Sequence, residues 1–141
     1  MLSLHFYNQI DSRYYMTKQK EHIKADGQEL SSCIIAALQD KKAQDVVEMD
    51  LTSVGVSLFD KFIICTATSN THADALTDSV YRMVKEKTGI IPNHIEGTIN
   101  AQWILMDYFD TVVHIFLAET REYYALERLW ADAAKKEYAG Q

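Results

Sequence analysis

The sequence predicts an α/β (α+β) fold in which a mixed β-sheet is packed with helices. Three observations support this: two segments repeat apolar residues with a helical period, one buried segment is continuously apolar and β-prone, and two later strands lie close enough to form a hairpin. The expected order along the chain is α β β α β β β α. A chain of 141 residues is predicted to form one domain around this sheet.

The first half of the chain supplies a helix and two strands. Asp26, followed three residues later by Glu29, resembles a capping box and predicts a helix start. Alternation over residues 47–51 predicts a strand with one wet face, residues 52–60 a loop, and the apolar run FIICTA (62–67) a central strand. The helix is expected to bury a stripe made of Leu30, Cys33, Ile34, Ala37 and Leu38.

The second half begins with a helix capped by Ser69 or Asn70 and stopped by Gly89. A short strand over 94–96 and two strands over 103–108 and 111–117 follow. A last helix is expected from about residue 119 to 136. The two helices are expected to bury Ala73, Leu76, Val80, Met83 and Val84 in the first, and Leu126, Leu129, Trp130 and Ala133 in the second.

Residues 1–25 are predicted to be an N-terminal tail and residues 26–137 the domain, because the tail shows no sustained period. Met16 is left open as an alternative start. The tail carries four basic and two acidic residues, a net charge of +2. The whole chain has a net charge of −6, so the rest of the chain carries −8. An acidic domain repels phosphate backbones, which predicts little direct contact with nucleic acid and favours a basic protein partner.

Composition and the positions of the cysteines indicate the class of protein and its cellular compartment. The chain is 48% hydrophobic with one proline, which is typical of an ordered globular protein. No apolar run approaches the ~20 residues of a membrane-spanning helix, so no membrane partner is expected. Cys33 and Cys65 both lie in apolar segments, which indicates buried thiols in a reducing compartment. With no signal-peptide pattern, this predicts a cytoplasmic protein.

The hairpin has two different faces if Phe109 and Asp110 form its turn. Trp103 then pairs with Phe116, and Ile104, Met106, Tyr108, Val113 and Ile115 form an apolar face. The opposite, mixed face carries Trp103, Leu105, Asp107, Val112, His114 and Phe116. Pattern alone leaves two interpretations of the mixed face: a second core layer with His114 paired to Asp107, or an exposed protein-binding surface.

Five separated sequence motifs together indicate a particular protein family. They are D-K-K-A-x-D-V-V (40–47), F-x-I-x-T-x-x-S-N (62–70), H-x-E-G (94–97), W-x-L-x-D-Y-x-D-x-V-V-H-x-F-L (103–117) and R-E-x-Y-x-L-E-x-L-W (121–130). In order and spacing they resemble the ribosomal silencing factors of the RsfS/Iojap family, over about residues 28–134. One departure is Phe109, where the family usually has glycine, so the turn type stays open.

The resemblance implies a nucleotidyltransferase-like fold without catalysis, cofactor or metal. Family members bind the large (50S) ribosomal subunit through ribosomal protein L-fourteen and sterically block subunit association, which represses translation when nutrients are limiting. A role in large-subunit assembly is the alternative, since organelle relatives have it. Whether the free protein is a homodimer is left open.

The residues expected to bind the partner lie on the mixed face, in the turn and on the last helix. They are Trp103, Leu105, Asp107, Tyr108, Asp110, His114, Phe116, Arg121 and Tyr124. Trp103→Ala is expected to cost about 2 kcal/mol of partner affinity with the fold intact.

An enzyme is disfavoured. A nucleotidyltransferase needs a D-x-D pair on a strand for Mg²⁺, and FIICTA contains no carboxylate, so residual nucleotide binding is only a weaker alternative. Asp74 and Asp78 are expected on a solvated helix face. A metal cluster of His94, Glu96, Asp107 and His114 matches no ligand spacing, and Cys65 has no basic neighbour to activate it.

Overall fold

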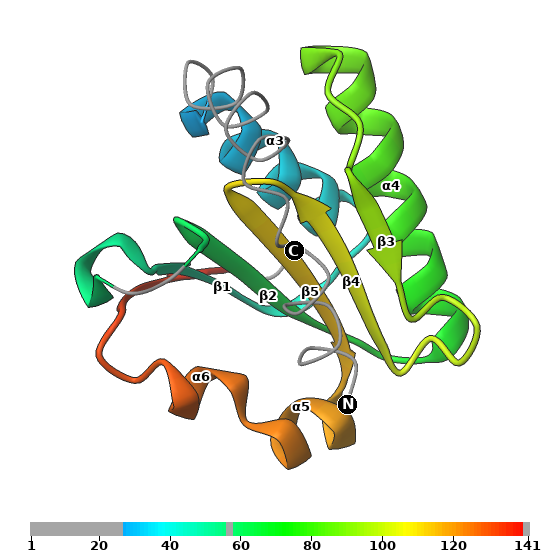
Figure 1. The fold of residues 1–141 in the computed structure, drawn as a ribbon. Coiled ribbons are helices and arrows are strands. Elements are labelled where there is room, and N and C mark those ends of the chain that lie inside the picture. Colours follow the sequence, from blue (N-terminus) through cyan, green and yellow to red (C-terminus); the bar gives the residue numbers. More distant parts are fainter. Residues whose placement is uncertain (1–26, 56–57, 140–141) are drawn as a thin grey trace.

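A six-stranded mixed sheet forms the centre of the computed structural model, which describes residues 27–55 and 58–139 (Figure 1). The strand order is β3-β4-β5-β2-β1-β6, and only β2 and β5 pair in parallel. The predicted mixed sheet is confirmed. Its strands are β1 (Gln44–Asp50), β2 (Lys61–Ala67), β3 (His94–Glu96), β4 (Trp103–Tyr108), β5 (Thr111–Leu117) and β6 (Ala134–Tyr138).

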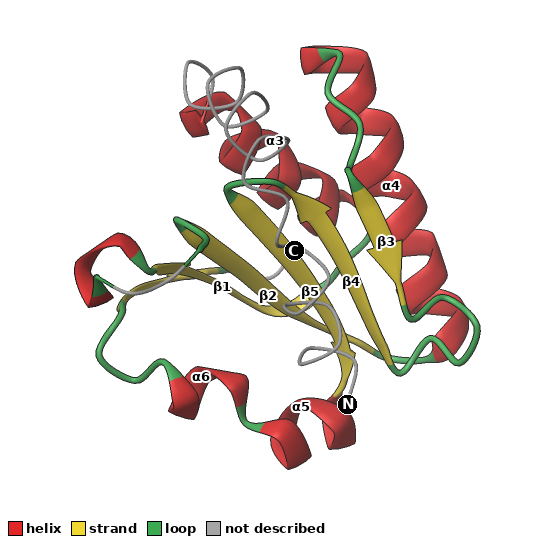
Figure 2. Cartoon of the chain, viewed as in Figure 1, coloured by secondary structure: helices red, strands yellow, loops and turns green. Residues whose placement is uncertain are grey.

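Helices cover both faces of this sheet (Figure 2). The long helices α3 (Gly27–Asp40) and α4 (Asn70–Thr88) pack on one face. The short helices α5 (Ala118–Tyr124) and α6 (Leu126–Leu129) lie against the other. Because each face of the sheet is apolar, each needs a cover, and the chain builds two separate core clusters.

The two long helices follow their sequence signals. The apolar stripe of α3 is buried from Leu30 to Leu38, while Asp26, its expected cap, lies outside the described residues. In α4 the Ser69 hydroxyl accepts a hydrogen bond from the His72 amide at 3.0 Å. Gly89 ends the helix with φ 75° and donates its amide to the Lys85 carbonyl, so both predicted ends are confirmed.

The segment after β5 differs from the single helix expected over 119–136. Ala125 has φ 47°, which ends α5 and separates it from α6. Residues 134–138 then pair antiparallel with β1, where Glu48 lies opposite Lys136. The expectation was wrong because alanine, lysine and glutamate favour helix locally, whereas the open edge of β1 offers hydrogen bonds that no local pattern reports.

The hairpin register is confirmed at every pair from Trp103–Phe116 to Tyr108–Thr111. Phe109 has a positive φ of 70°, and Asp110, the second turn residue, does not, which excludes a type I′ turn. The Asp107 carboxylate accepts a hydrogen bond from the Phe109 amide at 2.7 Å, which holds this conformation.

The Phe109 side chain at the tip of the hairpin adds no aromatic area to the surface. Its ring is only 3% exposed and packs in the cluster under α3 and α4. The burial of the ring therefore offsets the ~1–2 kcal/mol that a left-handed conformation costs a residue with a Cβ.

Phe109→Ala and Phe109→Gly should separate these two contributions. Both variants lose the buried ring, which is expected to cost about 3–5 kcal/mol of unfolding free energy. Only glycine relieves the positive φ, so the glycine variant should be about 1 kcal/mol more stable than the alanine variant. Urea denaturation measures both values, and equal stabilities would contradict a strained turn.

Candidate functional site

The mixed face of the hairpin is buried, not exposed. Trp103 is 3% exposed, and Leu105, His114 and Phe116 are fully buried beneath α5 and α6. Trp103 stacks on Phe116 with ring centroids 4.8 Å apart and meets Tyr124 of α5 at 4.9 Å. Of the two interpretations left open by the sequence, the structure therefore shows the second core layer.

His114 is held in that layer by Trp103 rather than by the expected Asp107. The indole Nε1 donates to His114 Nδ1 at 3.1 Å, so Nδ1 is an acceptor and the proton of the neutral ring sits on Nε2. Within the described residues, Nε2 has no hydrogen-bond partner, and the ring packs edge-on against Phe62 at 4.6 Å. Burial lowers the pKa of His114 to about 3.

Asp107 and Tyr108 serve the hairpin itself. Asp107 also accepts from Asn93 Nδ2 at 3.1 Å, and burial raises the pKa of this carboxyl despite its two hydrogen bonds. Tyr108 lies on the face under α3 and α4 and is fully buried, and burial raises the pKa of its hydroxyl. The backbone carbonyl of Asp110 accepts the amides of Asp60 and Lys61, which ties the turn to β2.

Arg121 anchors α5 to the ends of two strands. Its guanidinium donates to Glu127 at 2.7 Å, to the Asp45 carbonyl at 2.9 Å and to the Thr66 hydroxyl at 2.9 Å. The Arg121 side chain is only 14% exposed. A planar group with several donors is suited to such a junction, and this one fixes α5, α6, β1 and β2 relative to one another.

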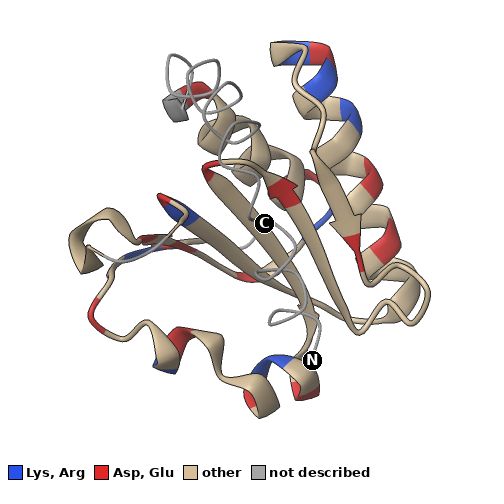
Figure 3. Ribbon diagram, viewed as in Figure 1, with Lys and Arg blue, Asp and Glu red and all other residues tan. Residues whose placement is uncertain are grey.

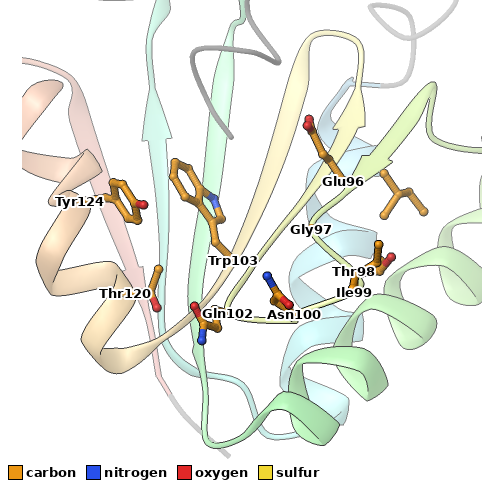
Figure 4. Close-up of a pocket in the computed structure, with 10 residues that line it drawn as sticks. Glu96, Gly97, Thr98, Ile99, Asn100, Gln102, Trp103, Thr120 and Tyr124 are labelled. Carbon is orange, nitrogen blue, oxygen red and sulfur yellow. The ribbon is translucent and has the colours of Figure 1, made fainter. Parts of the chain in front are cut away.

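A cleft of about 560 Å³ opens beside this buried layer, between α5 and the loop that joins β3 to β4 (Figure 4). Trp103 and Tyr124, two of the predicted residues, line it. Glu96 lies on one side of the cleft and Thr120 on the opposite side (Figure 4). The complete lining is Ile95, Glu96, Gly97, Thr98, Ile99, Asn100, Gln102, Trp103, Thr120 and Tyr124.

Gly97 brings the loop close to β4. It has φ 89°, and a Cβ placed on it would lie 2.0 Å from the Trp103 carbonyl oxygen. Only glycine fits this approach. The glycine of the H-x-E-G motif therefore shapes the cleft by letting the loop pack against the backbone of Trp103.

The sequence did not single out the exposed apolar residues near this cleft. Ile99 in the loop is 97% exposed and Tyr123 in α5 is 81% exposed, whereas Leu129, expected on an inner stripe, is 74% exposed. Ile99 lies in a loop, which has no periodic pattern, and Tyr123 and Leu129 lie in a predicted helix that is broken at Ala125, so only the structure could place them.

The metal, thiol and carboxylate candidates raised by the sequence have the following surroundings in the described part of the chain. No three His, Cys, Asp or Glu side chains there are grouped so that they could hold a metal ion. Burial raises the pKa of Cys65 to about 12, which keeps the thiol protonated. Asp78 pairs with Arg82 on the exposed face of α4, as a solvated helix face predicts. No described helix is long and apolar enough to cross a membrane.

Comparison with known proteins gives a consistent result. The family model described as ribosomal silencing factor during starvation matches residues 24–141. The ribosomal silencing factor RsfS of Halalkalibacterium halodurans is 39% identical over 114 residues, covering 80% of this chain and 95% of that protein. A crystal structure of a Chromobacterium violaceum protein superposes with a TM-score of 0.70 at 38% identity, covering 80% of this chain and 92% of that one.

A more distant relative has a different name. The mouse protein called mitochondrial assembly of ribosomal large subunit protein 1 is 31% identical over 99 residues. The match covers 69% of this chain and 43% of the mouse protein.

Proposed function

Since the chain belongs to the family of ribosomal silencing factors, we propose that it binds the large ribosomal subunit through ribosomal protein L-fourteen and blocks association with the small subunit. The likeness to RsfS proteins across nearly their whole length carries this proposal. Such blocking represses translation without a chemical step, because occupying the surface that the small subunit needs is sufficient. We place this activity in the cytoplasm.

The cleft and its rim are the proposed docking surface. Trp103, Tyr124 and Arg121 act from within it: the aromatic pair forms its wall, and Arg121 holds α5 in position. Exposed Ile99 and Tyr123 supply apolar contact area at the rim. The fully buried members of the expected site, such as His114 and Phe116, support this surface from beneath.

Charge supports a basic protein partner over nucleic acid. The chain carries −6, and Figure 3 shows the basic residues of its described part dispersed rather than gathered over the sheet. Nucleic-acid binding requires a basic patch or stripe. A standard protein–protein interface buries roughly 800 Å² on each partner. In the proposed complex the cleft, its rim and α5 together supply this area.

Pelleting with separated ribosomal subunits tests the proposal. The protein should co-sediment with large subunits and not with small ones, and it should reduce subunit joining on sucrose gradients. Ile99→Ala should weaken pelleting about tenfold, because an exposed rim anchor is lost with no cost to the core. Ile91→Ala removes the same side chain from an exposed position outside the cleft and should pellet normally. Pelleting with neither subunit would contradict the proposal.

A role in large-subunit assembly is the second candidate, favoured by the name of the mouse relative. The two roles differ in what cells without the protein accumulate. Immature large-subunit particles during growth would indicate assembly, whereas mature particles with excess joined ribosomes on starvation would indicate silencing. Residual nucleotide binding is a third, weaker alternative that calorimetry with Mg²⁺-ATP and Mg²⁺-CTP decides.

A further inference from the structure

We propose that the cleft receives one basic side chain of the docking partner, with its charged head against Glu96 and its methylene stem along Trp103 and Tyr124. This deepens the proposed function and rests on it only for the identity of the partner. The occupant is defined by chemistry: a guanidinium or ammonium group on a long apolar stem.

The first support is the state of the Glu96 carboxylate. Glu96 pairs with Leu105 across β3 and β4, so its side chain is on the mixed face, diagonal to Trp103. The side chain is 17% exposed, and its buried Oε2 accepts no hydrogen bond from any described residue. His94 Nε2 lies 3.5 Å from Oε2, which is within ion-pair distance.

The carboxylate therefore has one neighbouring donor, and its remaining acceptor positions are open to a ligand in the cleft. A basic side chain entering the cleft supplies a further donor to the accessible part of the Glu96 carboxylate through a charge-assisted hydrogen bond.

The second support is the shape and polarity of the cleft. Its apolar wall is formed by Trp103 and Tyr124, whose ring centroids are 4.9 Å apart, and Figure 4 shows Trp103 between Tyr124 and Glu96. The methylene groups of arginine and lysine pack well on such apolar surface while the charged end reaches a polar group. A volume of about 560 Å³ accommodates one such side chain with water around it.

The third support is charge complementarity. Among the ten lining residues there is one carboxylate, Glu96, and no lysine or arginine. A second acidic chain would bring a like charge to Glu96, whereas a basic partner brings the opposite one. The cleft therefore selects a cation by both its charge and its apolar wall.

Glu96→Gln tests the assignment on the full chain with purified large subunits. This variant keeps the size of the side chain and removes its charge, so it should weaken pelleting at least about tenfold and lower the salt dependence of binding. Glu86→Gln removes one carboxylate from the exposed surface of α4 and should stay within about twofold of the parent. Equal pelleting of both variants and the parent would overturn the proposal.

A second measurement does not depend on the ribosome. The chain has two tryptophans, Trp103 in the cleft and Trp130 outside it, which give two indole N–H signals in NMR spectra. Titration with a hexa-arginine peptide should shift the Trp103 signal and the Gly97 amide, leave Trp130 unmoved, and have no effect on Trp103 in Glu96→Gln. Absence of the shift in the parent protein would overturn the cleft assignment. Failure of the parent to pellet, with the shift present, would instead overturn the proposed function.

Discussion

Trp103→Ala is expected to destabilise the protein by about 3–5 kcal/mol. The indole is 3% exposed, stacks on Phe116, meets Tyr124 and donates its N–H to His114. Alanine would leave a cavity between the sheet and α5 and an acceptor on His114 without its donor. Because small domains are stable by only about 5–15 kcal/mol, much of the variant should be unfolded under mild denaturing conditions. Urea or thermal unfolding followed by circular dichroism measures the loss.

This result would change how binding experiments are read. The sequence predicted that Trp103→Ala lowers partner affinity with an intact fold, whereas burial of the indole means that pelleting of this variant largely reports its folded fraction. Tyr123→Ala is the matched control, since its ring is 81% exposed and its loss should change stability by less than about 0.5 kcal/mol. If Trp103→Ala were as stable as Tyr123→Ala, α5 and α6 would not cover the mixed face in solution.

The hairpin was predictable to the residue because two constraints agreed. Alternation sets which side chains share a face, and a two-residue turn fixes the pairing, so the register from Trp103 to Phe116 followed directly. The same reasoning could not decide whether the mixed face is covered. That depends on where residues 118–133 fold back, which is a tertiary property with no local signature.

The C-terminal strand and the cleft were missed for related reasons. Residues 134–138 are helix-prone as a sequence and become a strand only because β1 presents an open edge. The cleft is formed by Glu96 and Gly97 from one motif, Trp103 from a second and Tyr124 from a third. Each motif was recognised, but their proximity requires the pairing of β3 with β4 and the packing of α5, neither of which the spacing of motifs contains.

Acid should destabilise the protein through His114. Burial lowers its pKa to about 3 in the folded state, against about 6.5 in the unfolded chain, so the unfolded state binds the proton more readily between these values. The stabilising contribution is fully present above pH 6.5 and is lost as pH falls through 3, by about 1.4 kcal/mol per pH unit and about 5 kcal/mol in total. Denaturant unfolding at pH 7, 6, 5 and 4 measures this slope.

The slope can be assigned to His114 by comparison with His114→Phe. Asp107 contributes with the opposite sign: the pKa of its carboxyl is raised by burial, so its contribution to stability improves as pH falls. Because both proteins contain Asp107, the difference between them at each pH removes its effect. His114→Phe should be less stable at pH 7, since Trp103 loses its acceptor, yet lose less stability on acidification. His114→Asn, which keeps an acceptor for the indole, should show the same reduced slope, and parallel slopes for all three proteins would mean that His114 is not buried as a neutral ring.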